Sequence, residues 1–276
     1  VVEVGSEVLF LRPGDRVVVD PIQVCRKCRF CQQGLPNLCE RGGLRGRETD
    51  GLCSEYAVAP EGRSFKFGED ISFEEGTIFI CLYTVVYGQR RVPYVAGSKV
   101  VVLGMGLSGL LNAQLAKQSK AELVIGVSRS QWKLDLALRL GVDTAINALE
   151  VDPVEAVLGQ TEGLGADLVI ESAGSPETIR QSLEMVKPGG TVLQFGIGPK
   201  RVDELDMSTL YFKNIKVMGT RAGTPEDYRT SIKLVEARHI DLKPLITHRY
   251  PLEQIQEGFQ DVYGGANQIM RAVINI

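Results

Sequence analysis

Histidine is scarce in this sequence, and so are long apolar runs. Only 2 of the 276 residues are His, and Trp occurs once. The longest mostly apolar stretch, 77–87, is too short to cross a bilayer, and the chain does not open with a basic segment followed by an apolar one. We therefore expect no membrane partner and a cytoplasmic location.

Charge of one sign is also lacking. Lys and Arg number 31 against 34 for Asp and Glu, a formal net charge of −3. Such a balance provides no basic field for a phosphate backbone, so we expect no nucleic-acid partner. Hydrophobic residues make up 44% and charged residues 24%, which excludes a disordered or low-complexity chain. At roughly 150 residues per domain, the length predicts about two domains.

The six cysteines are too few for a disulfide scaffold of this length, and four of them lie close together. Their spacing is C-x2-C-x2-C-x7-C, whereas a ferredoxin-type run has three residues before its fourth Cys. Four thiolates at this spacing can close a tetrahedral zinc site, which would be structural because no ligand position stays open. A disulfide pair or unliganded thiols are the alternatives. The predicted ligands are Cys25, Cys28, Cys31 and Cys39.

The two remaining cysteines lie outside this cluster. We expect Cys53 to be a small buried side chain. Cys81 lies where the β-rich part of the chain gives way to the next part, so it could hold a catalytic zinc or simply be buried. His239 looks like a residue that caps a helix end, and His248 is expected in a turn. Since a catalytic zinc needs three protein ligands, this sequence offers one candidate, Cys81.

The pattern of secondary structure divides the chain into three zones. Residues 1–88 contain short β-like runs, such as 1–4, 17–19 and 55–58, broken by turn residues. Residues 89–225 alternate strands and helices, which predicts a parallel sheet covered on both faces. Residues 226–276 add helices and a final strand over 272–276, and we expect them to complete both other zones. Because the chain opens within an expected strand, we also expect it to be trimmed at its N-terminus.

A glycine-rich turn stands between the predicted strand 99–103 and the predicted helix 107–117. It fits G-x-G-x-x-G: Gly104 permits a tight turn, Gly106 lets the backbone approach a pyrophosphate, and Gly109 lets helix pack on strand. The helix N-terminus offers free N–H groups to phosphate. A Gly-rich turn in another α/β fold is the alternative. The turn therefore predicts a dinucleotide site that includes Leu107 and Ser108.

The next predicted strand ends in Ser128 and Arg129, where NAD-binding sites usually carry an acidic residue. A hydroxyl can donate to a 2′-phosphate and a guanidinium can pair with it, so this pair favours NADP over NAD. The alternative is a neutral ribose pocket in which Arg129 faces solvent.

Together these motifs resemble the zinc-containing medium-chain alcohol dehydrogenases, which include polyol and threonine dehydrogenases. The resemblance covers the whole chain and rests on the four-Cys lobe, the glycine turn and the segments 12–17, 50–56, 187–190 and 242–248. It implies a Rossmann domain, which is a doubly wound parallel sheet, and a GroES-like, mostly β catalytic domain, incomplete here at its N-terminus.

The resemblance also implies roles for single residues. Cys81 would match the third ligand of a catalytic zinc whose other ligands lie upstream of this chain. Arg271 would contact the cofactor phosphate. A homodimer or homotetramer is implied. The residues that would flank the nicotinamide are Ala173, Gly174, Gly196 and Ile197.

The function that follows is a zinc-dependent, NAD(P)-dependent oxidoreductase. It would transfer a hydride between the cofactor, NADP or NAD, and a small-molecule alcohol, polyol or carbonyl partner. A zinc-free quinone or enone reductase is one alternative, although that branch usually lacks the four-Cys lobe. A non-catalytic nucleotide-binding protein of the same fold is another. We expect the chain as given to be a catalytically incomplete fragment.

Overall fold

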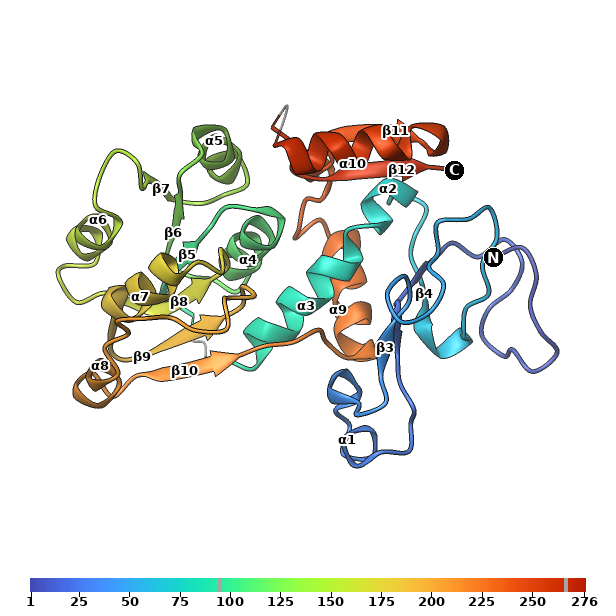
Figure 1. Ribbon diagram of the computed structural model, residues 1–276, viewed down its shortest axis with the longest axis horizontal. Helices are drawn as coiled ribbons and strands as arrows, with labels where there is room; N and C mark the ends of the chain where they lie inside the picture. The colour runs from blue at the N-terminus through green and yellow to red at the C-terminus, as the bar shows by residue number, and fades with distance from the viewer. Residues whose placement is uncertain (94–95, 266–267) are drawn as a thin grey trace. The chain divides into compact units, whose positions relative to one another are not determined.

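The computed structural model describes residues 1–93, 96–265 and 268–276. The chain divides into two compact units. Unit 1 consists of residues 1–84 and 221–276, and unit 2 of residues 85–220. Unit 2 is continuous in sequence, whereas unit 1 is made of two segments that lie at opposite ends of the chain. In Figure 1, both blue and red segments therefore belong to unit 1.

Unit 2 is built on a six-stranded sheet in which every paired strand is parallel to its neighbour. The order is β10-β9-β8-β5-β6-β7, so the direction of winding reverses between β5 and β8. This doubly wound order confirms the predicted α/β fold with a Rossmann sheet. The strands are β5 (Lys99–Leu103), β6 (Leu123–Ser128), β7 (Thr144–Asn147), β8 (Ala166–Glu171), β9 (Val186–Gln194) and β10 (Lys216–Gly219).

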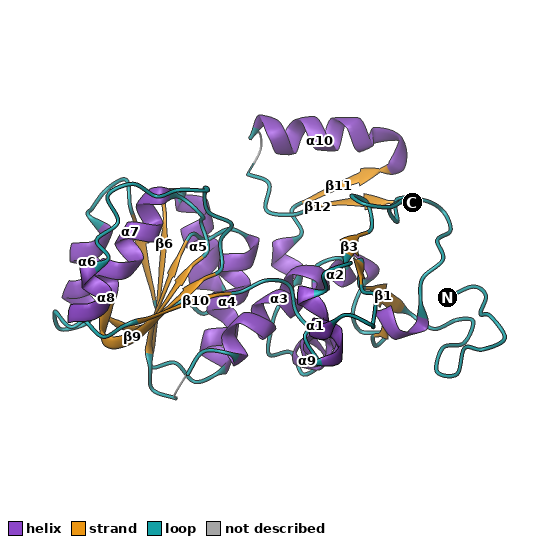
Figure 2. Cartoon of the chain, turned by 60° about the horizontal axis from the view of Figure 1, so that its bottom comes forward, coloured by secondary structure: helices purple, strands orange, loops and turns teal. Residues whose placement is uncertain are grey.

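Helices cover both faces of this sheet, as Figure 2 shows. The central strand β5 is consequently apolar along most of its length: Val100 to Leu103 have no exposed surface. Local signals start the helices, since Asp152 accepts hydrogen bonds from two backbone N–H groups of α6 and Ser175 begins a capping box for α7. The helices are α4 (Leu107–Gln118), α5 (Gln131–Arg139), α6 (Pro153–Gln160), α7 (Pro176–Met185) and α8 (Ser208–Phe212).

Unit 1 contains short strands that pair two by two. β1 (Val17–Val19) pairs antiparallel with β4 (Ser64–Lys66), and β2 (Ile22–Gln23) with β3 (Gly43–Leu44). The parallel pair joins β11 (His248–Pro251) to β12 (Ala272–Asn275). The helices of this unit are α1 (Arg29–Gln32), α2 (Phe73–Gly76), α9 (Pro225–Glu236) and α10 (Ile255–Gly264), and four 3₁₀ turns lie at Pro36–Leu38, Glu61–Arg63, Lys243–Leu245 and Leu252–Gln254. Helix α3 (Phe79–Arg90) begins in unit 1 and ends in unit 2.

Stacked aromatic rings hold the two segments of unit 1 together. Tyr228 lies between Phe65, with ring centroids 4.7 Å apart, and Tyr83, at 4.1 Å. Both tyrosines are almost completely buried. Two residues before Phe65, the buried Arg63 donates a hydrogen bond to the carboxylate of Asp20. The core of unit 1 thus depends on residues from before and after unit 2.

Two sequence expectations about strands are wrong. Residues 1–4 form no strand, although the Val1 ammonium group donates to Asp15 O at 2.8 Å. The run 55–58 is a loop in which Tyr56 is 75% and Val58 88% exposed. Both runs have β-forming side chains but no partner strand in the described ranges, and pairing is what stabilises a strand. His248, expected in a turn, begins β11. No helix in the ranges 1–93, 96–265 and 268–276 is both long and apolar enough to cross a membrane.

Candidate metal and cofactor sites

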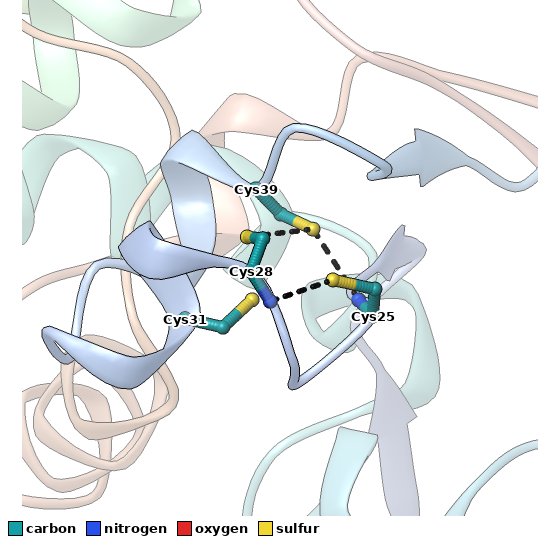
Figure 3. A group of neighbouring side chains, drawn as sticks. All are labelled: Cys25, Cys28, Cys31 and Cys39. Atoms are coloured by element: carbon teal, nitrogen blue, oxygen red, sulfur yellow. Dashed lines mark hydrogen bonds between the residues drawn. The ribbon is translucent and has the colours of Figure 1, made fainter.

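The four cysteines of the predicted metal cluster lie together. Their Sγ atoms are all within 4.8 Å of one another, and the Sγ atoms of Cys28 and Cys39 are 3.9 Å apart (Figure 3). In a tetrahedral zinc site with Zn–S bonds of about 2.3 Å, the sulfur atoms are about 3.8 Å apart. The thiol geometry therefore fits a structural zinc with four thiolate ligands.

The backbone around these thiols is arranged to stabilise thiolates. Cys25 N donates to Cys39 Sγ and Cys28 N to Cys25 Sγ, both at 3.3 Å. Hydrogen bonds from the backbone N–H groups of residues 31 and 40 lower the pKa of the Cys28 thiol to about 6, and those of residues 27 and 28 lower the pKa of Cys25. Loss of hydration, and then the neighbouring thiols, raise the pKa of Cys31 to about 12. A bound cation would offset that penalty, because thiols that coordinate a metal lose their protons.

The other two cysteines differ from each other. Cys53 is exposed, so the expectation that it is buried is wrong. Cys53 lies in the irregular loop before the exposed run 55–58, and this loop buries little of its surface. Cys81 is partly buried in the half of α3 that belongs to unit 1. Burial raises the pKa of its thiol, whereas the positive charge of Arg271 lowers it.

Cys81 is not part of a complete metal site in the described ranges. The one group of three or more potential ligands found there is the four-Cys cluster. The two histidines are in unit 1, His239 after α9 and His248 at the start of β11. The described residues thus supply Cys81 as a single candidate ligand and do not by themselves fit a catalytic zinc.

The glycine turn of unit 2 has the geometry that a dinucleotide needs. Gly104 has φ +94°, a backbone angle that residues with a side chain rarely adopt. A Cβ on Gly109 would lie 1.8 Å from the carbonyl oxygen of Gly104. A Cβ on Gly106, in contrast, would meet nothing within 4 Å. Open space therefore lies at Gly106, directly before the first residues of α4, Leu107 and Ser108. The turn fits a bound pyrophosphate, which would occupy that space next to the helix N-terminus.

The loops after β8 and β9 lie at the same, carboxyl edge of the sheet as the glycine turn. A Cβ on Gly104 would be 2.9 Å from the Cβ of Ala173, and one on Gly174 would be 2.7 Å from the carbonyl oxygen of Ile197. Ile197 itself is 99% exposed. In doubly wound sheets, ligands bind outside this edge, where the strand order reverses. The exposed, apolar side chain of Ile197 can therefore contact the ring of a bound ligand.

Ser128 and Arg129 follow at the end of β6, which neighbours β5. The Ser128 hydroxyl accepts a hydrogen bond from Ser130 N at 3.2 Å. Arg129 is exposed, and its guanidinium has no ion pair within the described part of the chain. Its charge is therefore available to an anionic ligand.

Arg271 lies in unit 1, immediately before β12. Its Nη2 donates to Thr77 O at 3.3 Å, and its buried Nε has no partner among the described residues. A buried donor without a partner costs free energy, which a bound anion would recover. This residue is therefore compatible with the phosphate contact that the sequence implies.

Two residues at the carboxyl edge of the unit 2 sheet escaped the sequence analysis. Glu171, the last residue of β8, is completely buried, and Gln194, the last residue of β9, donates to it. In sequence both lie in the alternating zone 89–225 and belong to none of the motifs identified there. A charged residue between the apolar run 168–170 and Ser-Ala-Gly was the signal that could have found Glu171.

Comparison with known proteins agrees with this geometry. Residues 1–69 match the family model of the alcohol dehydrogenase GroES-like domain, and residues 109–237 match that of the zinc-binding dehydrogenases. An L-threonine 3-dehydrogenase from Bacillus licheniformis is 35% identical over 266 residues, which are 94% of this chain and 75% of that protein. A probable D-xylulose reductase A from Aspergillus clavatus is 30% identical over 270 residues, 96% of this chain and 75% of that protein.

A solved structure supports the same assignment. The crystal structure of a zinc-binding dehydrogenase from Sinorhizobium meliloti 1021, bound to NADP, superposes with a TM-score of 0.94 at 31% identity. The match covers 100% of this chain and 81% of that one. A nicotinamide-dependent dehydrogenase is thus the class that the fold and the glycine turn define. The chain belongs to the zinc-containing medium-chain alcohol dehydrogenase family.

Proposed function

We propose that this chain binds a nicotinamide dinucleotide along the carboxyl edge of the unit 2 sheet and serves the oxidation of a small alcohol or polyol. The observation that carries the proposal is the open space at Gly106, between a strained glycine turn and the N-terminus of α4. Backbone N–H groups there suit a pyrophosphate, because the helix dipole favours negative charge. The place of this turn supports the proposal too, because it follows β5 at the carboxyl edge of the sheet, where the strand order reverses and where doubly wound sheets bind ligands.

Each part of this edge has a proposed role. The N–H groups of the turn from Gly104 to Gly109 hold the pyrophosphate. Arg271, which belongs to unit 1, is proposed separately as a contact of a cofactor phosphate. Ser128 and Arg129 face the ribose of the adenosine half and favour a 2′-phosphate, hence NADP. The S. meliloti structure, which contains NADP, supports that preference. The loop residues proposed to hold the nicotinamide half are Ala173, Gly174, Gly196 and Ile197.

We propose a structural role for the zinc of the four-Cys cluster and a separate role for Cys81. A thiolate shell with no open position can stabilise the lobe formed by residues 25–39 but cannot bind substrate. Cys81 is proposed as one ligand of a second zinc. The nicotinamide supplies the site that accepts or donates hydride. The residues of this chain bind and orient that group and keep an apolar surface, Ile197, beside it.

The substrate is proposed from the chemistry shared by the relatives. Threonine and xylulose, which appear in their names, are converted at a carbon that carries a hydroxyl or a carbonyl group. We therefore propose a small alcohol or polyol rather than a quinone or enone, because the four-Cys cluster is complete here. We further propose that residues 1–88 and 226–276 serve the substrate side and residues 89–225 the cofactor side.

Cofactor binding and turnover test the proposal separately. Fluorescence titration with NADPH and NADH should give saturable binding, which Gly106→Ala weakens. Turnover would then be followed by nicotinamide absorbance with L-threonine, xylitol and 2,3-butanediol as alcohols and NADP⁺ or NAD⁺ as acceptor. Little turnover is expected from this chain, because its described residues offer Cys81 as a single ligand of a catalytic zinc. If the chain binds neither NADPH nor NADH, the proposal is contradicted.

A further inference from the structure

The carboxylate of Glu171 collects hydrogen-bond donors from the loop that follows β8. Its Oε1 atom accepts from Ala173 N at 3.0 Å, from Gly174 N at 2.7 Å and from Thr178 Oγ1 at 2.7 Å. Glu171 has no exposed surface. A buried carboxylate is costly unless its oxygens find donors, and here one oxygen has three. The loop is therefore folded around this side chain.

The same residue also holds the loop that follows β9. Its Oε2 atom accepts from Gln194 Nε2 at 2.6 Å, and that amide also donates to Gly196 O at 3.0 Å. In addition, the backbone carbonyl of Glu171 accepts from the N–H groups of Phe195 and Gly196, both at 2.8 Å. One buried residue thus links two loops that are more than 20 positions apart in sequence.

Little free space remains between these loops. A Cβ on Gly196 would lie 2.6 Å from Gly174 N and 2.7 Å from Glu171 Oε2. A Cβ on Gly174 would collide with the carbonyl oxygen of Ile197 at 2.7 Å. Because the glycines permit this close approach, the carboxylate can be shared by both loops. The backbone that carries the exposed Ile197 side chain is consequently held in place by these close contacts with the loop after β8.

We propose that Glu171 is a positioning residue that joins the loops after β8 and β9 into one surface and thereby sets the affinity for the nicotinamide half of the cofactor. The inference rests on the proposed function. A carboxylate suits this place because all four side-chain contacts come from donors, whereas a glutamine would turn an amide N–H₂ toward one of them. An apolar residue would leave those donors without partners.

Ligands with and without the nicotinamide ring separate this role from a general structural one. Calorimetry would measure binding of NADP⁺ and of 2′-phospho-ADP-ribose, which lacks the nicotinamide, and also of the pair NAD⁺ and ADP-ribose. We expect Glu171→Gln to weaken dinucleotide binding about tenfold or more and to leave binding of the nicotinamide-free ligands within about twofold. Glu155→Gln, the same change at an exposed position of α6, is the matched control and should alter neither.

Two further variants distinguish loss of the contact between the loops from misfolding of the protein. Gln194→Leu keeps the three donors to Oε1 and the backbone bonds from Phe195 and Gly196 to Glu171 O, and removes only the side-chain link to the second loop. A smaller loss of affinity, confined to the dinucleotides, is therefore expected. The reversed pair, Glu171→Gln with Gln194→Glu, restores an amide–carboxylate contact and should recover part of the affinity. Full recovery is not expected because Gly196 O then lacks its donor.

Specific results would overturn the inference. Equal losses for dinucleotides and nicotinamide-free ligands would show that Glu171 supports the unit as a whole and not the nicotinamide surface. Unchanged dinucleotide affinity in a folded Glu171→Gln variant would show that the two loops do not depend on the carboxylate. A wild-type chain that binds neither kind of ligand would instead overturn the proposed function, and this inference with it.

Discussion

The Sγ atoms of Cys28 and Cys39 lie 3.9 Å apart, although 11 positions separate the two residues in sequence. That distance matches the sulfur–sulfur edge of a tetrahedral zinc thiolate site, and all four Sγ atoms of the cluster lie within 4.8 Å of one another. A zinc ion bound by these thiolates would hold together the two ends of the loop between Cys28 and Cys39.

We predict that Cys39→Ser loses the zinc of this cluster and loosens unit 1. Structural zinc contributes about 10–16 kcal/mol of apparent binding free energy in small zinc-finger peptides, so a three-thiol remnant should hold the metal far less tightly. Zinc released by a thiol reagent, measured with a colorimetric chelator, gives the stoichiometry. Cys53→Ser, at the exposed cysteine, is the control and should retain one equivalent. Retention of tightly bound zinc by Cys39→Ser would contradict the assignment.

The two glycines Gly106 and Gly109 should respond differently to alanine. Gly106 has φ −76° and open space around it, but it is the N-cap of α4, where Ala is disfavoured. Gly106→Ala should therefore change stability by no more than about 1 kcal/mol while weakening cofactor binding. Gly109→Ala would place a Cβ 1.8 Å from the carbonyl oxygen of Gly104 and should destabilise unit 2 by about 1–3 kcal/mol or more. Thermal unfolding and NADPH titration of both variants distinguish these effects. Unchanged NADPH affinity in a folded Gly106→Ala variant would argue that the space is not a ligand cradle.

Arg129→Ala should lower the affinity for NADP(H) selectively. A charge-assisted hydrogen bond contributes about 1.5–3 kcal/mol, which corresponds to roughly a 10- to 100-fold weaker binding of the 2′-phosphate. Binding of NAD(H) should change little. Arg139→Ala, at the exposed last residue of α5, removes the same charge elsewhere in unit 2 and serves as the control. Equal losses of affinity for NADP(H) and NAD(H) would mean that Arg129 does not contact the 2′-phosphate.

The ion pair of Glu74 and Arg249 should give unit 1 a small pH-dependent stability. The Arg249 guanidinium donates through Nε and Nη2, each at 2.8 Å, and lowers the pKa of Glu74. A carboxyl whose pKa is lower in the folded state stabilises the fold above its unfolded pKa, about 4.3. That contribution disappears as the pH falls through the folded value.

Arg249→Gln should therefore be slightly less stable than the wild type at pH 7, and this difference should vanish as the pH falls through the lowered, folded-state pKa of Glu74. The effect should be small because the pair is partly exposed to solvent, and 1 M salt should shrink it further. Denaturant unfolding at several pH values makes the measurement. A difference that persists at low pH would show that Arg249 acts through packing and not through its charge.

The alternating part of the chain could be predicted well because its signals are local. The strand 99–103 and the helix from residue 107 were found from apolar runs and from a glycine turn that needs each of its glycines, and both lie within one residue of β5 and α4. The four-Cys cluster was also visible, since ligand spacing is written directly in the sequence.

What could not be predicted depends on contacts between distant segments. The run 55–58 has β-forming residues, but whether it pairs depends on a partner that no local pattern reveals. Glu171 looks like an ordinary strand end, because its Oε2 partner, Gln194, lies 23 positions later. The exposure of Cys53 is likewise set by how its loop packs and not by its own chemistry.

The aromatic stack of unit 1 also fixes an order of events on the ribosome. Tyr83 packs on Tyr228, so about 145 residues must be synthesised between the two rings. Unit 2 lies entirely within that interval and can fold first, as domains generally do during synthesis. At roughly 5–20 residues per second, Phe65 and Tyr83 wait about 7–30 s for their partner. During that time an apolar surface of the nascent chain stays open to chaperones and to neighbouring chains, whereas the finished protein buries it.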